Sequence, residues 1–347
     1  MVLPSNPSRT GYGAIDTMSL TPGKLAGLKA ISNSHGVIAA LALDQRGILK
    51  RAIGREMGTE DVPDSAMVEF KEIVTEVLTK DASAILLDPE YGLPAAKRRN
   101  STGLLIAYER SSYDAAPPRL PDLYEHLSVR RLKEAGADSI KILLHYIPFD
   151  LPAINEQKHA WVERIGDECR ANDIPFVLEL LGYDAHGGDG KNLAYAKCKP
   201  QIVIQSVREF SKDRYCVDLL KVEVPVLMKF VAGSRFFKGE QAYTEAEARE
   251  HFRATSSATQ KPFVYLSAGV SNAEFIETLE FASASGGHFN GVLCGRATWQ
   301  DGVSVYAKGG AKALEQWLGM YGLENLARLN NALKAAQPWY DRLSVLA

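Results

Sequence analysis

The chain has 347 residues, of which 46% are apolar, and its formal net charge is −2. This balance favours neither a nucleic-acid partner nor a membrane-surface partner, and no apolar run approaches the length of a membrane span. The four cysteines are scattered and form no CxxC pair, and the N-terminus has no signal-peptide core, so we expect a protein of the reducing cytoplasm.

Short apolar runs alternate with helical patterns along most of the chain. Residues 1–24 are polar and rich in proline and glycine, and we expect them to form a flexible N-terminal arm. Beyond them, eight runs have the composition of buried strands: residues 37–43, 83–87, 103–108, 139–146, 175–181, 217–224, 262–268 and 290–295. Between these runs, apolar residues recur at the spacing of a helix, and the capping boxes Thr244-x-x-Glu247 and Ser271-x-x-Glu274 predict where two of the helices begin.

Eight strands that alternate with helices predict an α/β fold, a (β/α)8 TIM barrel, as a single domain over residues 25–347. A doubly wound sheet is the alternative, but no Gly-rich dinucleotide fingerprint follows the first strand. Leucines at helical spacing after the eighth strand predict two extra C-terminal helices within the same domain. The Gly-rich stretch 184–192 is expected to be a mobile loop at the barrel mouth.

The working residues of such barrels lie at or near the carboxyl ends of the strands. Seven of the eight predicted strands present polar residues there, the exception being residues 103–108. The candidates are Asp44 and Gln45 after the first strand, Asp88 after the second, Lys141 in the fourth, Glu179 in the fifth, Lys221 in the sixth, Ser267 and Gly269 after the seventh, and Gly295 and Arg296 after the eighth.

Three of these residues, Lys141, Glu179 and Lys221, each interrupt an apolar run. Strand alternation puts Lys221 on the face of Val217 and Leu219, and if this face is the barrel interior the three side chains converge. A buried ion pair of purely structural role is one interpretation, but three such residues on neighbouring strands favour chemistry. Dry and already positive surroundings would lower the pKa of a buried lysine and expose its free amine.

A free amine attacks a ketone to form a Schiff base, and a neighbouring carboxylate can carry the protons. The seven histidines show no HxxH or HExxH spacing, so we expect no metal and no cofactor. The runs SAG (267–269) and CGRAT (294–298) each lead from a strand into a helix start, where backbone N–H groups and the Arg296 guanidinium suit a phosphate. These features together predict a metal-independent aldolase that acts on a sugar phosphate.

Five motifs closely resemble class I tagatose 1,6-bisphosphate aldolases: LALDQRG (41–47), LLDPEYGLP (86–94), LKVEVPV (220–226), YLSAGVS (265–271) and FNGVLCGRATW (289–299). The resemblance implies that Lys221 forms the Schiff base and that Glu179 shuttles protons. It also implies that Asp44 and Gln45 lie against the substrate and that Lys141 helps to bind it. Ser267, Gly269, Gly295 and Arg296 would hold the C1 phosphate. Either Glu179 or Asp44 would remove the proton of the C4 hydroxyl.

Two alternatives remain open at this point. One is a class I aldolase for a related ketose, such as fructose 1,6-bisphosphate or sulfofructose 1-phosphate. The other is a sugar-phosphate-sensing regulatory protein that retains the pocket. The sequence does not identify the residues that bind the distal phosphate, although Arg46 and Lys50 are candidates, and it leaves a homo-oligomer of two or four subunits open.

Overall fold

The computed structural model describes residues 20–110, 118–184 and 190–343. Within them, eight parallel strands form a closed barrel, and each strand pairs with the next one along the chain. The strands are β1 (Ile38–Leu43), β2 (Ala84–Leu87), β3 (Gly103–Ala107), β4 (Ser139–His145), β5 (Phe176–Leu181), β6 (Leu219–Glu223), β7 (Phe263–Leu266) and β8 (Gly291–Cys294). Strand β8 pairs with β1, which confirms the predicted barrel over the doubly wound sheet.

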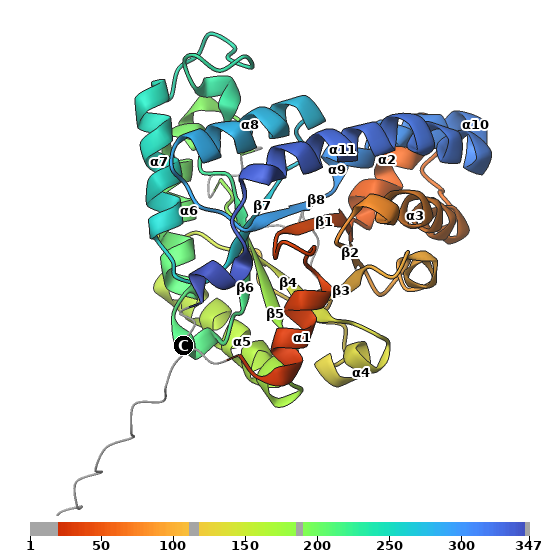
Figure 1. Ribbon diagram of the computed structural model, residues 1–347, viewed down its shortest axis with the longest axis horizontal. Coiled ribbons are helices and arrows are strands. Elements are labelled where there is room, and N and C mark those ends of the chain that lie inside the picture. Colours follow the sequence, from red (N-terminus) through yellow and green to blue (C-terminus); the bar gives the residue numbers. More distant parts are fainter. Residues whose placement is uncertain (1–19, 111–117, 185–189, 344–347) are drawn as a thin grey trace, which may run out of the picture.

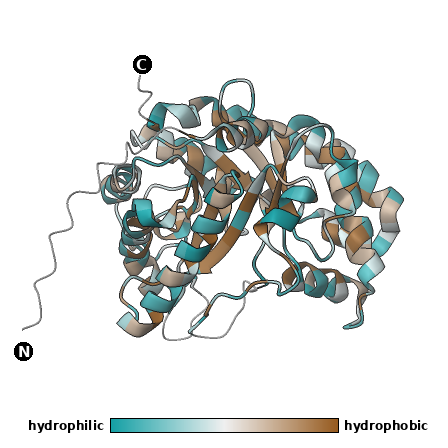
Figure 2. Cartoon of the chain, turned by 90° about the horizontal axis from the view of Figure 1, so that it is seen from below, coloured by the Kyte–Doolittle hydropathy of each residue, from teal (hydrophilic) through white to brown (hydrophobic). Residues whose placement is uncertain are grey.

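Helices surround the barrel on its outer side, as Figure 1 shows. They are α1 (Pro22–Ala30), α2 (Gly47–Met57), α3 (Asp64–Leu78), α4 (Val129–Glu134), α5 (Pro152–Ala171), α6 (Leu193–Phe210), α7 (Glu245–Ser257), α8 (Asn272–Ala284), α9 (Arg296–Trp299), α10 (Gly302–Trp317) and α11 (Leu323–Ala332). Figure 2 shows hydrophobic strands at the centre and hydrophilic residues on the surrounding helices. The strands are nearly continuous apolar runs because they are covered on both faces.

A separate apolar cluster fills the barrel interior below the polar candidates. Val177 of β5 and Leu219 of β6 belong to this cluster. Because side chains alternate along a strand, Glu179 and Lys221 lie on the same inward faces, two residues further on. The predicted inward orientation of Glu179 and Lys221 is therefore confirmed. Trp339 belongs to the same interior cluster, and its backbone N–H donates to the carbonyl of Gly36 just before β1.

Helix α1 begins at Pro22, within the segment expected to be a flexible arm. Lys24 in this helix is buried, and its Nζ lies 2.8 Å from Oδ2 of Asp218. The ordered fold thus starts before residue 25, and the predicted arm is too long at its carboxyl end. Residues 1–19 lie outside the described residues, as do residues 185–189 of the predicted loop 184–192.

Two helices, α10 and α11, follow β8 at the positions predicted for the extra C-terminal helices. Helix α10 packs against α2 and α3, and α11 packs against α8. Thr244 and Glu247 form the predicted capping box of α7, and the Ser271 side chain accepts a hydrogen bond from the Glu274 backbone at the start of α8. Among the described residues, no helix has both the length and the apolar character needed to cross a membrane.

Candidate active site

A buried glutamate lies between two lysines at the centre of the barrel. Glu179 and Lys221 are partners in the β5–β6 register, and Oε2 of Glu179 lies 2.9 Å from Nζ of Lys221. The same oxygen lies 2.8 Å from Nζ of Lys141 on β4. All three side chains are buried. The structure therefore brings together the three residues that the sequence predicted to converge.

Lys141 lies at the centre of a wider network of ion pairs. Its Nζ also lies 2.7 Å from Oδ2 of Asp44 and 2.7 Å from Oε1 of Glu109. Lys141 and Asp44 are not among the residues that line the cavity described below. A positioning role therefore fits Lys141 better than the expected contact with substrate, because its ammonium group holds three carboxylates in place.

Glu109 is a member of this network that the sequence analysis missed. It comes directly after Tyr108, at the carboxyl end of the one predicted strand without a polar candidate, and that position is the signal in the sequence. The side chain is 1% exposed, and its Oε2 has no hydrogen-bond partner among the described residues. Burial raises the pKa of Glu109, against the opposing charges of Lys141 and Arg46.

Charges of both signs meet in this network. Lys141 is the second cation that the sequence predicted near Lys221, and Glu179 lies between the two lysines. The charges of Arg46 and Lys71 also act on Glu109 and Asp44. Burial opposes ionisation of Asp44, but the charges of Lys141 and Lys221 outweigh it and hold the pKa of Asp44 well below its ordinary value. The network therefore offers Lys221 a proton acceptor, Glu179, and a neighbouring cation, Lys141.

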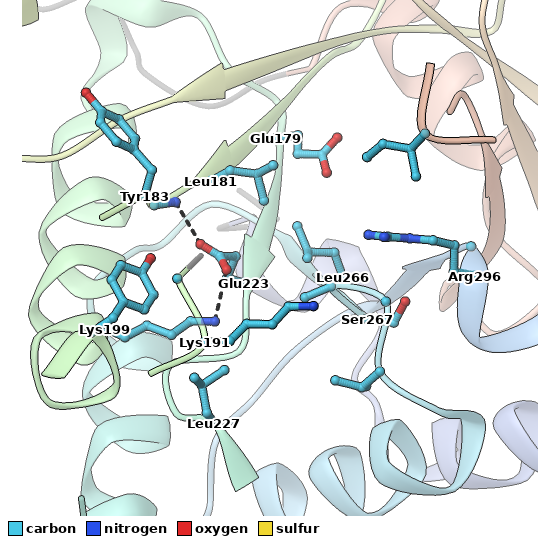
Figure 3. A pocket seen from close by; sticks show the side chains of 18 of the residues that line it. Glu179, Leu181, Tyr183, Lys191, Lys199, Glu223, Leu227, Leu266, Ser267 and Arg296 are labelled. Carbon is cyan, nitrogen blue, oxygen red and sulfur yellow. Dashed lines mark hydrogen bonds and ion pairs between the residues drawn. The ribbon is translucent and has the colours of Figure 1, made fainter. Parts of the chain in front are cut away.

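A cavity of about 710 Å³ opens at the carboxyl ends of the strands. The predicted residues that line it are Gln45, Glu179, Lys221, Ser267, Gly269, Gly295 and Arg296. Figure 3 shows Glu179, Ser267 and Arg296 around this shared space. The cavity thus combines the central amine and carboxylate with both of the turns that were predicted to hold a phosphate.

The turns after β7 and β8 approach each other closely because they contain glycine. Gly269 has a φ of 79°, and the preceding Ala268 has a φ of 50°. A Cβ on Gly269 would lie 2.7 Å from Cζ of Arg296, and a Cβ on Gly295 would lie 2.5 Å from the carbonyl oxygen of Ala42. The guanidinium can therefore lie directly over the Ser267–Gly269 turn, an arrangement that suits an anionic group.

Five further cations that line the cavity were not predicted as site residues: Arg119, Lys191, Lys199, Lys229 and Lys238. Lys229 and Lys238 belong to the connection between β6 and α7 and line the cavity. Burial raises the pKa of Glu274, and the charges of Lys238 and Lys229 oppose this rise, which places both lysines near the first turn of α8. Their position in a connecting segment gave no periodic signal in the sequence.

Arg46 and Lys50, the candidates for the distal phosphate, do not line the cavity. Arg46 donates a hydrogen bond to the hydroxyl of Tyr124, and Nζ of Lys50 lies 2.8 Å from Oδ1 of Asp64. Within the described ranges, no group of three or more His, Cys, Asp and Glu side chains is arranged to hold a metal. Metal independence stays a prediction.

Comparison with known proteins gives the family. A model of the DeoC/LacD family of aldolases matches residues 38–301, from β1 to beyond β8. The chain belongs to this family. This family agrees with the sequence resemblance and with the barrel fold. The matched region contains every residue of the ion network and of the two turns that follow β7 and β8.

Curated relatives match nearly the whole chain. The tagatose 1,6-diphosphate aldolase of Listeria monocytogenes serotype 4a (strain HCC23) is 52% identical over 328 residues, which cover 94% of this chain and 96% of that protein. The tagatose 1,6-diphosphate aldolase 2 of Enterococcus faecalis (strain ATCC 700802 / V583) is 52% identical, with 94% and 99% covered. The tagatose 1,6-diphosphate aldolase of Lactococcus lactis subsp. lactis is 49% identical, with 94% and 100% covered.

A solved structure supports the fold. Fructose-bisphosphate aldolase from Plasmodium falciparum, in a complex with TRAP and a small-molecule inhibitor, superposes with a TM-score of 0.61. The match covers 90% of this chain and 94% of that chain at 15% identity. At this identity the likeness shows a shared barrel architecture alone.

Proposed function

We propose that this DeoC/LacD-family aldolase cleaves D-tagatose 1,6-bisphosphate reversibly to dihydroxyacetone phosphate and D-glyceraldehyde 3-phosphate through a Schiff base on Lys221. The contact between Lys221 and Glu179, in a cavity that Arg296 also lines, carries the proposal. A primary amine and a carboxylate that exchanges protons with it are the two groups that imine formation requires. The substrate comes from the names of the relatives.

Imine formation follows from the geometry of the pair. The C1 phosphate binds at the turns that contain Ser267, Gly269 and Arg296, which orients the C2 carbonyl toward Lys221. Lys221 gives a proton to Glu179, 2.9 Å away, and its nitrogen then attacks C2 to form a carbinolamine. Glu179 returns the proton to the carbinolamine hydroxyl, which leaves as water, and a protonated imine remains.

The protonated imine accepts the electron pair of the C3–C4 bond as that bond breaks. The C4 hydroxyl loses its proton in this step, and C4 leaves as the aldehyde of glyceraldehyde 3-phosphate. Glu179 lines the cavity and Asp44 does not, which favours Glu179 over Asp44 as the base. The enamine then takes up a proton at C3, and hydrolysis of the imine releases dihydroxyacetone phosphate and restores Lys221.

The test is a cleavage assay with D-tagatose 1,6-bisphosphate, in which the release of dihydroxyacetone phosphate is followed with and without EDTA. We expect turnover that EDTA leaves unchanged. Absence of turnover, or its loss with EDTA, contradicts the proposal. Parallel assays with fructose 1,6-bisphosphate and sulfofructose 1-phosphate test the alternative substrates, and faster cleavage of either one reassigns the specificity.

A further inference from the structure

A buried tyrosine lines the cavity with its hydroxyl unpaired. Tyr195 of α6 is 6% exposed, and its hydroxyl has no hydrogen-bond partner within the described part of the chain. Burial and the charge of Glu223 raise the pKa of Tyr195, so the hydroxyl keeps its proton and remains a donor. An unpaired buried donor is unfavourable, and a polar group that enters the cavity would satisfy it once the Tyr195 side chain turns toward that group.

An ion pair lies beside this tyrosine. Lys199, four residues after Tyr195 on α6, has its Nζ 2.9 Å from Oε1 of Glu223. Residues four apart share a helix face, so Tyr195 and Lys199 reach the same wall of the cavity. Oε2 of Glu223 accepts a hydrogen bond from the backbone N–H of Gly182, with an N–O distance of 2.7 Å. Figure 3 shows Glu223 facing Lys199 across this wall.

Gly182 makes room for the tyrosine hydroxyl. A Cβ at this position would lie 2.5 Å from the hydroxyl oxygen of Tyr195 and 3.4 Å from Oε2 of Glu223. A phenolic donor and a carboxylate acceptor therefore border one small volume. A sugar hydroxyl, which both donates and accepts hydrogen bonds, matches this combination.

This wall and the two phosphate-binding turns lie on opposite sides of Lys221. Strand β6 lies between β5 and β7 in the barrel, with Gly182 following β5 and Ser267 following β7. Glu223 comes two residues after Lys221 on the same face of β6, about 7 Å nearer the mouth. A ketose with its C2 at Lys221 and its C1 phosphate at the turns would extend its remaining carbons toward this wall.

We infer that Tyr195 and the Lys199–Glu223 ion pair form a subsite that binds hydroxyl groups of the distal half of the ketose, carbons C4 to C6. This inference rests on the proposed function and deepens it. The distal half becomes the aldehyde product. Dihydroxyacetone phosphate contains only carbons C1 to C3, so it occupies Lys221 and the phosphate-binding turns without reaching the subsite.

The variant Tyr195→Phe tests the subsite because it removes the hydroxyl and keeps the ring. Tyr265→Phe is the matched control: Tyr265 of β7 is 1% exposed, its hydroxyl also has no partner among the described residues, and it lies outside the cavity lining. Gly182→Ala is a second variant, since the added methyl would displace the Tyr195 hydroxyl. Each variant is assayed for cleavage of D-tagatose 1,6-bisphosphate and for borohydride trapping of dihydroxyacetone phosphate on Lys221.

We expect Tyr195→Phe to lower kcat/KM for cleavage about ten- to hundredfold, while the trapped adduct forms at the wild-type yield. Gly182→Ala should also lower kcat/KM for cleavage without lowering the yield of the trapped adduct. Tyr265→Phe should change neither kcat/KM nor the adduct yield. Unchanged kcat/KM in Tyr195→Phe, or an equal loss of the adduct, would overturn the subsite. Failure of the wild-type protein to form any adduct would instead reject the proposed function on which the subsite depends.

Discussion

Oε2 of Glu179 lies 2.9 Å from Nζ of Lys221, and the two residues are direct partners across the β5–β6 pair. Both side chains extend from strands rather than loops, so the register of the barrel fixes their separation. Lys141 contacts the same oxygen from β4 at 2.8 Å and limits the movement of the carboxylate. A proton-transfer pair held on rigid elements is preorganised for chemistry.

Replacement of Glu179 tests the proton shuttle. Glu179→Gln keeps the shape of the side chain but removes its ability to accept a proton, and we expect kcat to fall about 100- to 10,000-fold. Steady-state cleavage kinetics measure this change. Glu277→Gln is the control, because Glu277 is also a buried carboxylate, lies 2.7 Å from Nε of Arg235 and does not line the cavity. A fall of similar size in the control would point to a general loss of structure.

Lys141 should contribute strongly to stability. Lys141→Met leaves Asp44, Glu109 and Glu179 without their shared cation, and we expect a loss of about 3–5 kcal/mol of unfolding free energy. Urea denaturation measures the loss. Adding Glu109→Gln to this variant should restore part of the stability, since it removes one of the three negative charges. A denaturation midpoint equal to that of the wild type would show that the network does not depend on Lys141.

The lowered pKa of Asp44 predicts a dependence of stability on pH. A carboxyl group whose pKa is lower in the folded state than in the unfolded state stabilises the fold at pH values above its unfolded pKa, which is about 4. This contribution to the unfolding free energy decreases as the pH falls below that value. The unfolding free energy of the wild type should therefore decrease between about pH 5 and pH 3 more steeply than that of Asp44→Asn. Denaturation series across this range give both slopes, and equal slopes would contradict the assignment.

The close approach of Gly269 to Arg296 predicts a selective effect on phosphate binding. Gly269→Ala places a methyl group 2.7 Å from Cζ of Arg296, so we expect KM for the bisphosphate to rise about tenfold or more. Gly286→Ala is the matched control, because its φ of 75° is close to the 79° of Gly269 and a Cβ there meets nothing within 4 Å. Similar KM values in the two variants would show that backbone strain, and not the displaced guanidinium, causes the change.

The strands and the central pair could be predicted because their signals are local. Each predicted strand lies within two residues of the observed one at both ends, since a strand covered on both faces must be a continuous apolar run. A polar residue inside such a run is easy to recognise, and the alternation of side chains then predicts on which side of the strand it lies. Glu179 and Lys221 could be identified from the sequence in this way, and the β5–β6 register of the structure pairs them directly.

The remaining site residues depend on the three-dimensional arrangement. Tyr195 and Lys199 lie on α6, where a tyrosine and a lysine four residues apart look like part of an ordinary amphipathic helix. The sequence predicted that Lys141 converges with Glu179 and Lys221, but its contacts with three carboxylates are set by how neighbouring strands are staggered. The contact of Glu109 with Lys141 likewise appears only when the barrel places the residues after β3 beside β4.

Covalent trapping tests the central claim most directly. The protein is incubated with dihydroxyacetone phosphate, reduced with borohydride, digested and analysed by mass spectrometry, with Lys221→Met treated in parallel. The account predicts a stable adduct on Lys221 and no adduct in the variant. An unmodified Lys221 in a preparation that still cleaves D-tagatose 1,6-bisphosphate would contradict it.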